Sequence, residues 1–176
     1  VIFSDFNYGC LPQSFVDEVI DLCARRSIPF LADSQASSQI GDVSRFKGSI
    51  CLSATEREAR LALNDFKSGL QSVVERLSFE SEAENLIIKL GASGLVAMSS
   101  SQGRKTDSLR ALNSNPSDVA GAGDALLATC SLLFACGGDI WESALLGSIA
   151  AGIQVSRVGN VPLSKDDLVR QLQSLE

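Results

Sequence analysis

The chain has 176 residues, 45% of them hydrophobic and 20% charged, which is typical of one globular domain with a sizeable core. Its net charge of −6, without any cluster of Lys and Arg, argues against nucleic acid or an anionic membrane as a partner. The absence of histidine excludes His-based triads and His-ligated zinc sites. The five cysteines are scattered without a C-x-x-C pair, as expected for reduced thiols in a cytoplasmic protein.

In the first half of the chain, short apolar runs alternate with segments of helical periodicity. Pro12 favours the start of a helix, and apolar residues recur with helical spacing over 15–23, beginning with Phe15. Thr55 and Glu58 form a capping box that starts a further helix. The other expected elements here are strands at 1–5, 28–32 and 49–52 and a helix at 67–77. This βαβ rhythm predicts an α/β fold with a mainly parallel sheet and helices on both faces.

The second half begins with a predicted β-hairpin around the turn Gly91-Ala92-Ser93. A long apolar helix is expected to end at Gly137-Gly138, and Asp139 with Glu142 forms the capping box of the next helix. The other expected elements are a polar loop at 99–108, a short strand at 109–112, the apolar helix at 121–136, a helix of small residues at 140–155, and a terminal helix beginning at Ser164.

The stretch Asp118-Val119-Ala120-Gly121-Ala122-Gly123-Asp124 lies at the start of the apolar helix. Small residues at a helix start allow backbone N–H groups to point at an anion, which the helix macrodipole also favours. A carboxylate at Asp124 would be repelled by that anion, unless it accepts a proton from a hydroxyl that attacks a bound phosphoryl group. The alternative is a glycine-rich turn in which Asp124 only complements the helix dipole.

This stretch resembles the D-T-x-G-A-G-D signature of the ribokinase-like (PfkB-type) carbohydrate kinases, and the resemblance extends over essentially the whole chain. It implies a ribokinase-like three-layer sandwich and ATP-dependent phosphorylation of a hydroxyl of a sugar or sugar phosphate. It also implies ATP and Mg²⁺ as cofactors, with K⁺ as a further candidate. By resemblance, Gly121, Ala122 and Gly123 form the anion hole, and Asp124 is the catalytic base.

The same resemblance bears on the organisation of the chain. Kinases of this family are roughly twice as long in outline, so residues 1–176 look like the C-terminal part of a single kinase domain. The N-terminal half, with its β-sheet lid, is therefore expected to be absent. A homodimer formed through that lid is a further expectation.

Two other stretches resemble parts of the family's nucleotide and metal sites. Lys89, Gly91 and Gly94 match the [TK]-L-G-x-x-G turn that borders the phosphates and ribose of the nucleotide. Glu56 matches the Glu of N-x-x-E, which organises water around magnesium, although Ser53 replaces the Asn. The alternatives are an ordinary hairpin turn with a solvated lysine, and an acidic residue that complements a helix dipole.

Two stretches near the C-terminus resemble further binding segments. Residues 147–152, which include Ser148 and Gly152, are similar to the helix of small residues that forms a wall of the adenine pocket. Residues 157–160 resemble a loop that, with Asp118, often holds a monovalent cation, mainly through backbone carbonyls. The alternative for the helix is tight packing against another helix.

The start of the chain resembles heptose-7-phosphate kinases, the sugar-kinase half of bifunctional ADP-heptose synthesis proteins. Asp5 lies in a stretch similar to S-D-Y-x-K-G, and Asp33 lies where those proteins have D-P-K; both are candidate substrate residues at strand ends. Tyr8 and Gln35 replace the two lysines. These losses leave open a catalytically degenerate nucleotide- or sugar-binding module derived from such a kinase. A flavodoxin-like interaction domain, in which G-A-G-D is coincidental, is a second alternative.

Overall fold

The computed structural model describes residues 1–35, 41–113 and 115–174. The chain divides into two compact units, each of which is described by itself. The first unit comprises residues 1–90 and 96–107, and the second comprises residues 91–95 and 108–176. Among the described residues, no helix has both the length and the apolar character needed to cross a membrane.

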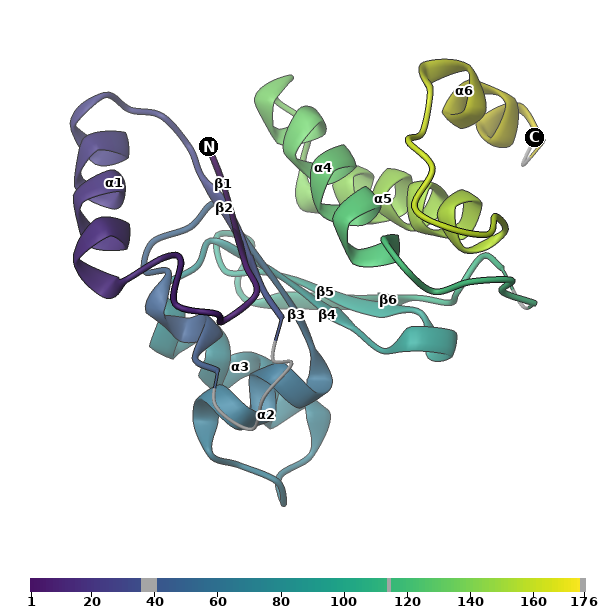
Figure 1. Ribbon diagram of the computed structural model, residues 1–176. Coiled ribbons are helices and arrows are strands. Elements are labelled where there is room, and N and C mark those ends of the chain that lie inside the picture. Colours follow the sequence, from purple (N-terminus) through teal and green to yellow (C-terminus); the bar gives the residue numbers. More distant parts are fainter. Residues whose placement is uncertain (36–40, 114, 175–176) are drawn as a thin grey trace. The chain divides into compact units, whose positions relative to one another are not determined.

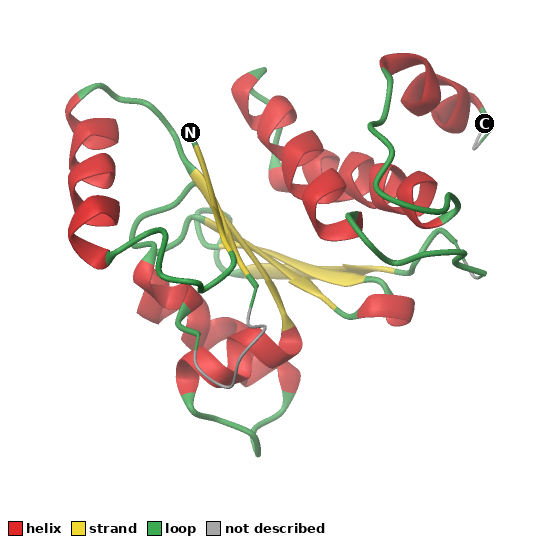
Figure 2. Ribbon diagram, in the orientation of Figure 1, coloured by secondary structure: helices red, strands yellow, loops and turns green. Residues whose placement is uncertain are grey.

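Six strands form one sheet in the order β1-β2-β3-β4-β5-β6 (Figure 1). The strands are β1 (Ile2–Asp5), β2 (Leu31–Ser34), β3 (Cys51–Thr55), β4 (Asn85–Lys89), β5 (Leu95–Ser99) and β6 (Lys105–Leu109). The α-helices are α1 (Gln13–Arg25), α2 (Glu56–Leu63), α3 (Leu70–Ser81), α4 (Ala122–Ala135), α5 (Ile140–Val155) and α6 (Lys165–Gln173). Two short 3₁₀ helices are η1 (Val43–Arg45) and η2 (Gly91–Ser93) (Figure 2).

The first four strands are parallel, with Asp33 of β2 opposite Ser53 of β3 in the register. The connections from β4 to β5 and from β5 to β6 are too short for the crossover that parallel strands need, so these strands run antiparallel. The predicted hairpin around Gly91-Ala92-Ser93 is therefore confirmed. The predicted polar loop at 99–108 and strand at 109–112 are wrong, because β6 begins at Lys105. This edge strand is polar and mostly exposed, so it lacks the apolar pattern on which the prediction depended.

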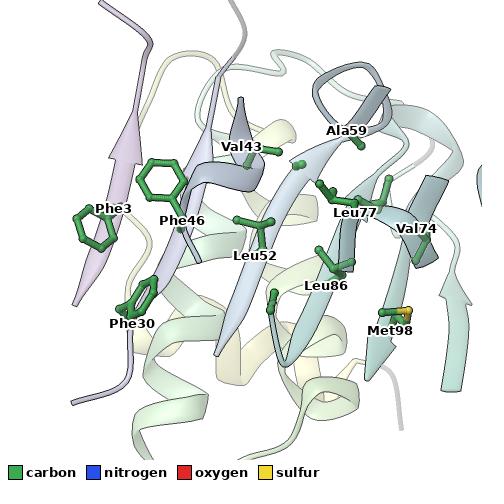
Figure 3. Close-up of a cluster of buried hydrophobic side chains, with 14 of the residues drawn as sticks. Phe3, Phe30, Val43, Phe46, Leu52, Ala59, Val74, Leu77, Leu86 and Met98 are labelled. Carbon is green, nitrogen blue, oxygen red and sulfur yellow. The ribbon is translucent and has the colours of Figure 1, made fainter. Parts of the chain in front are cut away.

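One face of the sheet in the first unit packs against α1, α2 and α3 through a continuous apolar core (Figure 3). Phe3 lies at one end of this core, with its ring centroid 5.5 Å from that of Phe30 and 5.3 Å from that of Phe46. Helix α1 contributes Val16 and Cys23, both buried, whereas Phe15 is 48% exposed. The predicted apolar stripe of this helix is therefore narrower than expected at its N-terminal end. The other labelled members of the core are Val43, Leu52, Ala59, Val74, Leu77, Leu86 and Met98.

In the second unit, α4 and α5 pack directly against each other. A Cβ on Gly147 of α5 would lie 2.7 Å from Sγ of Cys130 of α4, so only glycine allows this close approach. The Cys130 thiol donates a hydrogen bond to the carbonyl of Ser143 at 3.1 Å, and burial raises its pKa to about 12. Helix packing thus accounts for part of the small-residue pattern of α5. The capping boxes predicted at the starts of α2 and α5 are confirmed. The terminal helix predicted to begin at Ser164 is α6, with Ser164 as its N-cap.

Candidate active site

In the first unit, acidic side chains lie at the C-terminal ends of neighbouring parallel strands, where open α/β sheets bind ligands. Asp5 ends β1, and its Oδ2 lies 2.8 Å from a guanidinium nitrogen of Arg45. Asp33 of β2 accepts hydrogen bonds from Nζ of Lys89 at 2.9 Å and 2.8 Å, one on each carboxylate oxygen. The two aspartates are only 4% and 3% exposed, so each buried charge has a cationic partner, as buried carboxylates require.

The position of Lys89 contradicts the alternative of a solvated lysine at a hairpin turn. It lies at the end of β4, and its side chain is only 16% exposed because it extends to Asp33. Its ammonium group is paired with a buried carboxylate instead. Ser53 of β3 lies opposite Asp33 in the register, and its hydroxyl is fully buried. Within the described part of the chain this hydroxyl has no hydrogen-bond partner.

Glu56, the candidate magnesium residue, occupies the first turn of α2, directly after β3. Its Oε1 accepts from Nε of Arg60 at 2.8 Å and lies 2.7 Å from the terminal guanidinium nitrogen of the same residue. The Glu56 side chain is 41% exposed, so solvent can reach it. Arg60 also donates to the carbonyls of Asp65 and Ser68, so it is fixed independently of Glu56.

Asn7 joins the ends of β1 and β2, close to the two positions where lysines are replaced. Its backbone has φ +56°, and its Nδ2 donates to Oγ of Ser34 and to the carbonyl of Gln35, both at 2.8 Å. Tyr8 is 75% exposed, and its ring stacks on that of Phe6. The described turn is therefore held by an amide, without a lysine.

In the second unit, α4 begins directly after Gly121, whose φ of +75° lies in the left-handed region. The N-cap Gly121 has no side chain that could cap this helix, so the N–H groups of Gly123 and Asp124 are not covered by it. The N–H of Ala122 donates to the carbonyl of Val119 at 3.4 Å. Asp124 is the only acidic residue of this first turn. The geometry is that of a helix N-terminus suited to an anion, with a carboxylate beside it.

Asp118 ties the loop before α4 to the loop after α5. Its Oδ1 accepts from the N–H of Ala120 and its Oδ2 from the N–H of Gly159, each at 3.0 Å. These hydrogen bonds hold the pKa of Asp118 below its ordinary value of 3.8. The side chain of Asn160 completes the contact, since a Cβ on Gly121 would lie 2.5 Å from its Oδ1.

The lowered pKa of Asp118 predicts a specific acid sensitivity. Because the pKa is lower in the folded state, the stabilisation is fully present above the unfolded value near 3.8, and it is lost as the pH falls through the folded value. Asp118→Asn should therefore lower the melting temperature at pH 7, and the difference from wild type should shrink below pH ~3.8. Melting curves between pH 7 and 2 test this, with the exposed Asp21→Asn of α1 as control. A difference that stays constant across that range would contradict the role of the charge.

The turn that was expected to border the nucleotide is packed against the end of β6 and the residues that follow it. A Cβ on Gly94, whose φ is +96°, would lie 1.9 Å from the carbonyl oxygen of Leu109. Gly152 of α5 contacts the same segment, because its carbonyl accepts from Nδ2 of Asn113 at 3.2 Å. Its missing Cβ would lie 3.6 Å from Leu112. Ser148, on the same helix, is buried. The segment 109–113 thus joins the candidate phosphate turn to the candidate adenine wall.

Several of these contacts were not anticipated from the sequence. Arg45 belongs to no recognisable motif, and Asn113 lies directly after the segment 109–112 that was expected to be a strand. Each acts on a residue distant in the sequence, as Arg45 does on Asp5. Local patterns contain no signal for such partners.

Similarity to known proteins shows the family of the chain. The model of the family "pfkB family carbohydrate kinase" matches residues 3–166. The chain belongs to this family. The family match removes the alternative of an unrelated flavodoxin-like domain.

The chain is similar to a curated relative, the bifunctional protein HldE of Desulfatibacillum aliphaticivorans. It is 29% identical over 177 residues, which cover 98% of this chain and 35% of that protein. HldE of Koribacter versatilis is 32% identical over 179 residues, with 98% and 35% covered. The chain spans about a third of the length of these relatives.

Solved structures show the same fold. Ribokinase from Thermotoga maritima has a TM-score of 0.74 and 19% identity, covering 98% of this chain and 56% of that chain. Phosphofructokinase-2 from Escherichia coli, in complex with potassium, has a TM-score of 0.81 and 15% identity, covering 99% and 56%. The predicted ribokinase-like α/β fold is therefore confirmed.

Proposed function

We propose that this chain is part of an ATP-dependent kinase that phosphorylates a hydroxyl of a sugar or sugar phosphate. The observation that supports the proposal most directly is the uncapped start of α4, with Asp124 in its first turn, in a chain of the pfkB family. Backbone N–H groups there suit a phosphoryl group, and Asp124 suits the proton of an attacking hydroxyl. Heptose 7-phosphate is the finer candidate for the acceptor, because of the stretches around Asp5 and Asp33.

We assign a role to each candidate residue from the chemistry of its functional group. The amides of Gly121, Ala122 and Gly123 stabilise the charge that develops on the transferred phosphoryl group. Asp124 accepts the proton of the acceptor hydroxyl. Lys89, with the turn that contains Gly91 and Gly94, and the wall formed by Ser148 and Gly152 bind the nucleotide.

Glu56 is the residue we propose for magnesium. Mg²⁺ usually keeps several waters and binds one or two carboxylates together with substrate phosphates. A 41% exposed carboxylate, engaged by Arg60 through one oxygen only in the contacts described above, fits such water-mediated binding. When bound, the cation would supply positive charge to the nucleotide phosphates.

The second candidate function is a catalytically degenerate binding module. Tyr8 and Gln35 replace lysines, and Ser53 replaces an asparagine, in stretches that otherwise resemble the kinases. A module of this kind would bind nucleotide or sugar without transferring phosphate.

Titration calorimetry with Mg·ATP on the 176-residue chain tests the proposal. We expect weak, magnesium-dependent binding and no sugar phosphorylation by the chain alone, since orienting an acceptor is worth ~7–11 kcal/mol of barrier. Gly123→Val should abolish binding by crowding the start of α4. The control is Gly69→Val at the start of α3, where an added Cβ meets nothing within 4 Å. Absence of Mg·ATP binding would contradict the kinase proposal, and equal binding by both valine variants would place the phosphates elsewhere.

A further inference from the structure

A buried glutamine occupies the place between the two loops of the second unit where a monovalent cation was expected. Gln154 lies near the end of α5 and is 1% exposed. Its Nε2 donates to the carbonyl of Ala120 at 3.3 Å and to the carbonyl of Gly159 at 3.0 Å. Because both partners are acceptors, the amide must present its NH₂ group here and not its oxygen.

The two carbonyls belong to the same loops that Asp118 joins. One loop precedes α4 and the other follows α5, and the Asp118 carboxylate accepts an N–H from each of them. Carbonyl oxygens that converge from separate loops beside a carboxylate are the ligand types preferred by hard cations. The Gly159 carbonyl also accepts from the N–H of Val161 at 3.1 Å, so both of its lone pairs are used.

A K⁺ ion therefore does not fit these residues as they are arranged. To coordinate a cation, the Ala120 and Gly159 carbonyls would have to release the Gln154 amide, which would then be left buried without those partners. Losing buried hydrogen bonds is costly, because the groups cannot turn to water. The Gln154 amide already donates an N–H to each of the two carbonyl oxygens that a cation would coordinate.

We infer that Gln154 is a built-in substitute for a monovalent cation, and that this chain holds its α4 start in place without K⁺. The side chain lies between the two loops and joins them through uncharged donors. The inference concerns the structure of these loops, so it does not depend on catalytic turnover by the chain.

Melting temperatures in different salts test this inference. The chain is measured in KCl, NaCl and tetramethylammonium chloride at equal ionic strength, as wild type and as Gln154→Ala, Gln154→Met and Gln171→Ala. Gln171 is an exposed glutamine of α6 and serves as the matched control. We expect no K⁺-specific change in wild type or in Gln171→Ala. Gln154→Ala should melt lower than wild type in tetramethylammonium chloride, and K⁺ at ten times its dissociation constant should raise its melting temperature by about 3–6 °C.

Gln154→Ala removes the two N–H donors and also leaves space for an ion. Gln154→Met removes the donors but fills that space, so it separates the two effects. It keeps the volume, so it should melt lower than wild type in every salt without responding to K⁺. A K⁺-specific rise of similar size in wild type would overturn the inference, because the carbonyls would then bind the cation with the glutamine present. Lack of response in Gln154→Ala would overturn it equally, since the loops would not form a cation cradle. If Gln154→Ala folds only when KCl is present, that rescue is the expected result; failure to fold in every salt counts against the inference.

Discussion

Asp124→Asn is expected to slow phosphoryl transfer by ~10²–10⁴-fold in a form of the protein that phosphorylates a sugar, while Mg·ATP affinity stays close to that of wild type. Asparagine preserves the shape of the side chain at the start of α4 but cannot accept the proton of the acceptor hydroxyl. Single-turnover kinetics measure the chemical step, and calorimetry measures the affinity.

The control for this prediction is Asp166→Asn, which changes a first-turn aspartate of another helix, α6. Loss of the dipole interaction alone costs only ~0.3–1 kcal/mol of stability at either site. It therefore explains a small loss of stability in both variants, but not a large loss of rate in one of them. Near-normal turnover by Asp124→Asn would refute the assignment of Asp124 as the base.

Gly94→Ala is expected to destabilise the fold by about 2–5 kcal/mol, combining a left-handed backbone with an overpacked contact. The added Cβ would lie 1.9 Å from the carbonyl oxygen of Leu109 and 2.7 Å from the N atom of Ala111, so backbone would have to move. The free energy of unfolding in urea measures the effect. The segment 109–113 would shift with it, and nucleotide affinity should fall as well.

Gly91→Ala, in the same turn, is the matched control. Gly91 also has a positive φ, +59°, but its missing Cβ meets nothing within 4 Å. It should cost only about 1–2 kcal/mol, the usual penalty for a left-handed residue. Equal losses of unfolding free energy in the two variants would mean that the left-handed backbone conformation alone causes the loss. The contact with Leu109 would then contribute nothing.

Local patterns were sufficient for most of the helices and for the first four strands. The capping boxes at Thr55, Asp139 and Ser164 give the starts of three helices, because a cap depends only on residues three apart. The strands from β1 to β4 each contain a short apolar run, which is the signal that predicted them. Strand β6 was missed because an exposed edge strand has no such run.

The sequence by itself determined the family, the α/β fold and the helix start that contains Gly121 and Asp124, since these depend on short contiguous motifs. Only the tertiary structure decided which partners the candidate residues have. Lys89 meets Asp33, which is 56 positions away, and Gln154 reaches Ala120 across 34 positions. Both partners are placed by strand register or helix packing, and no local pattern encodes either of these.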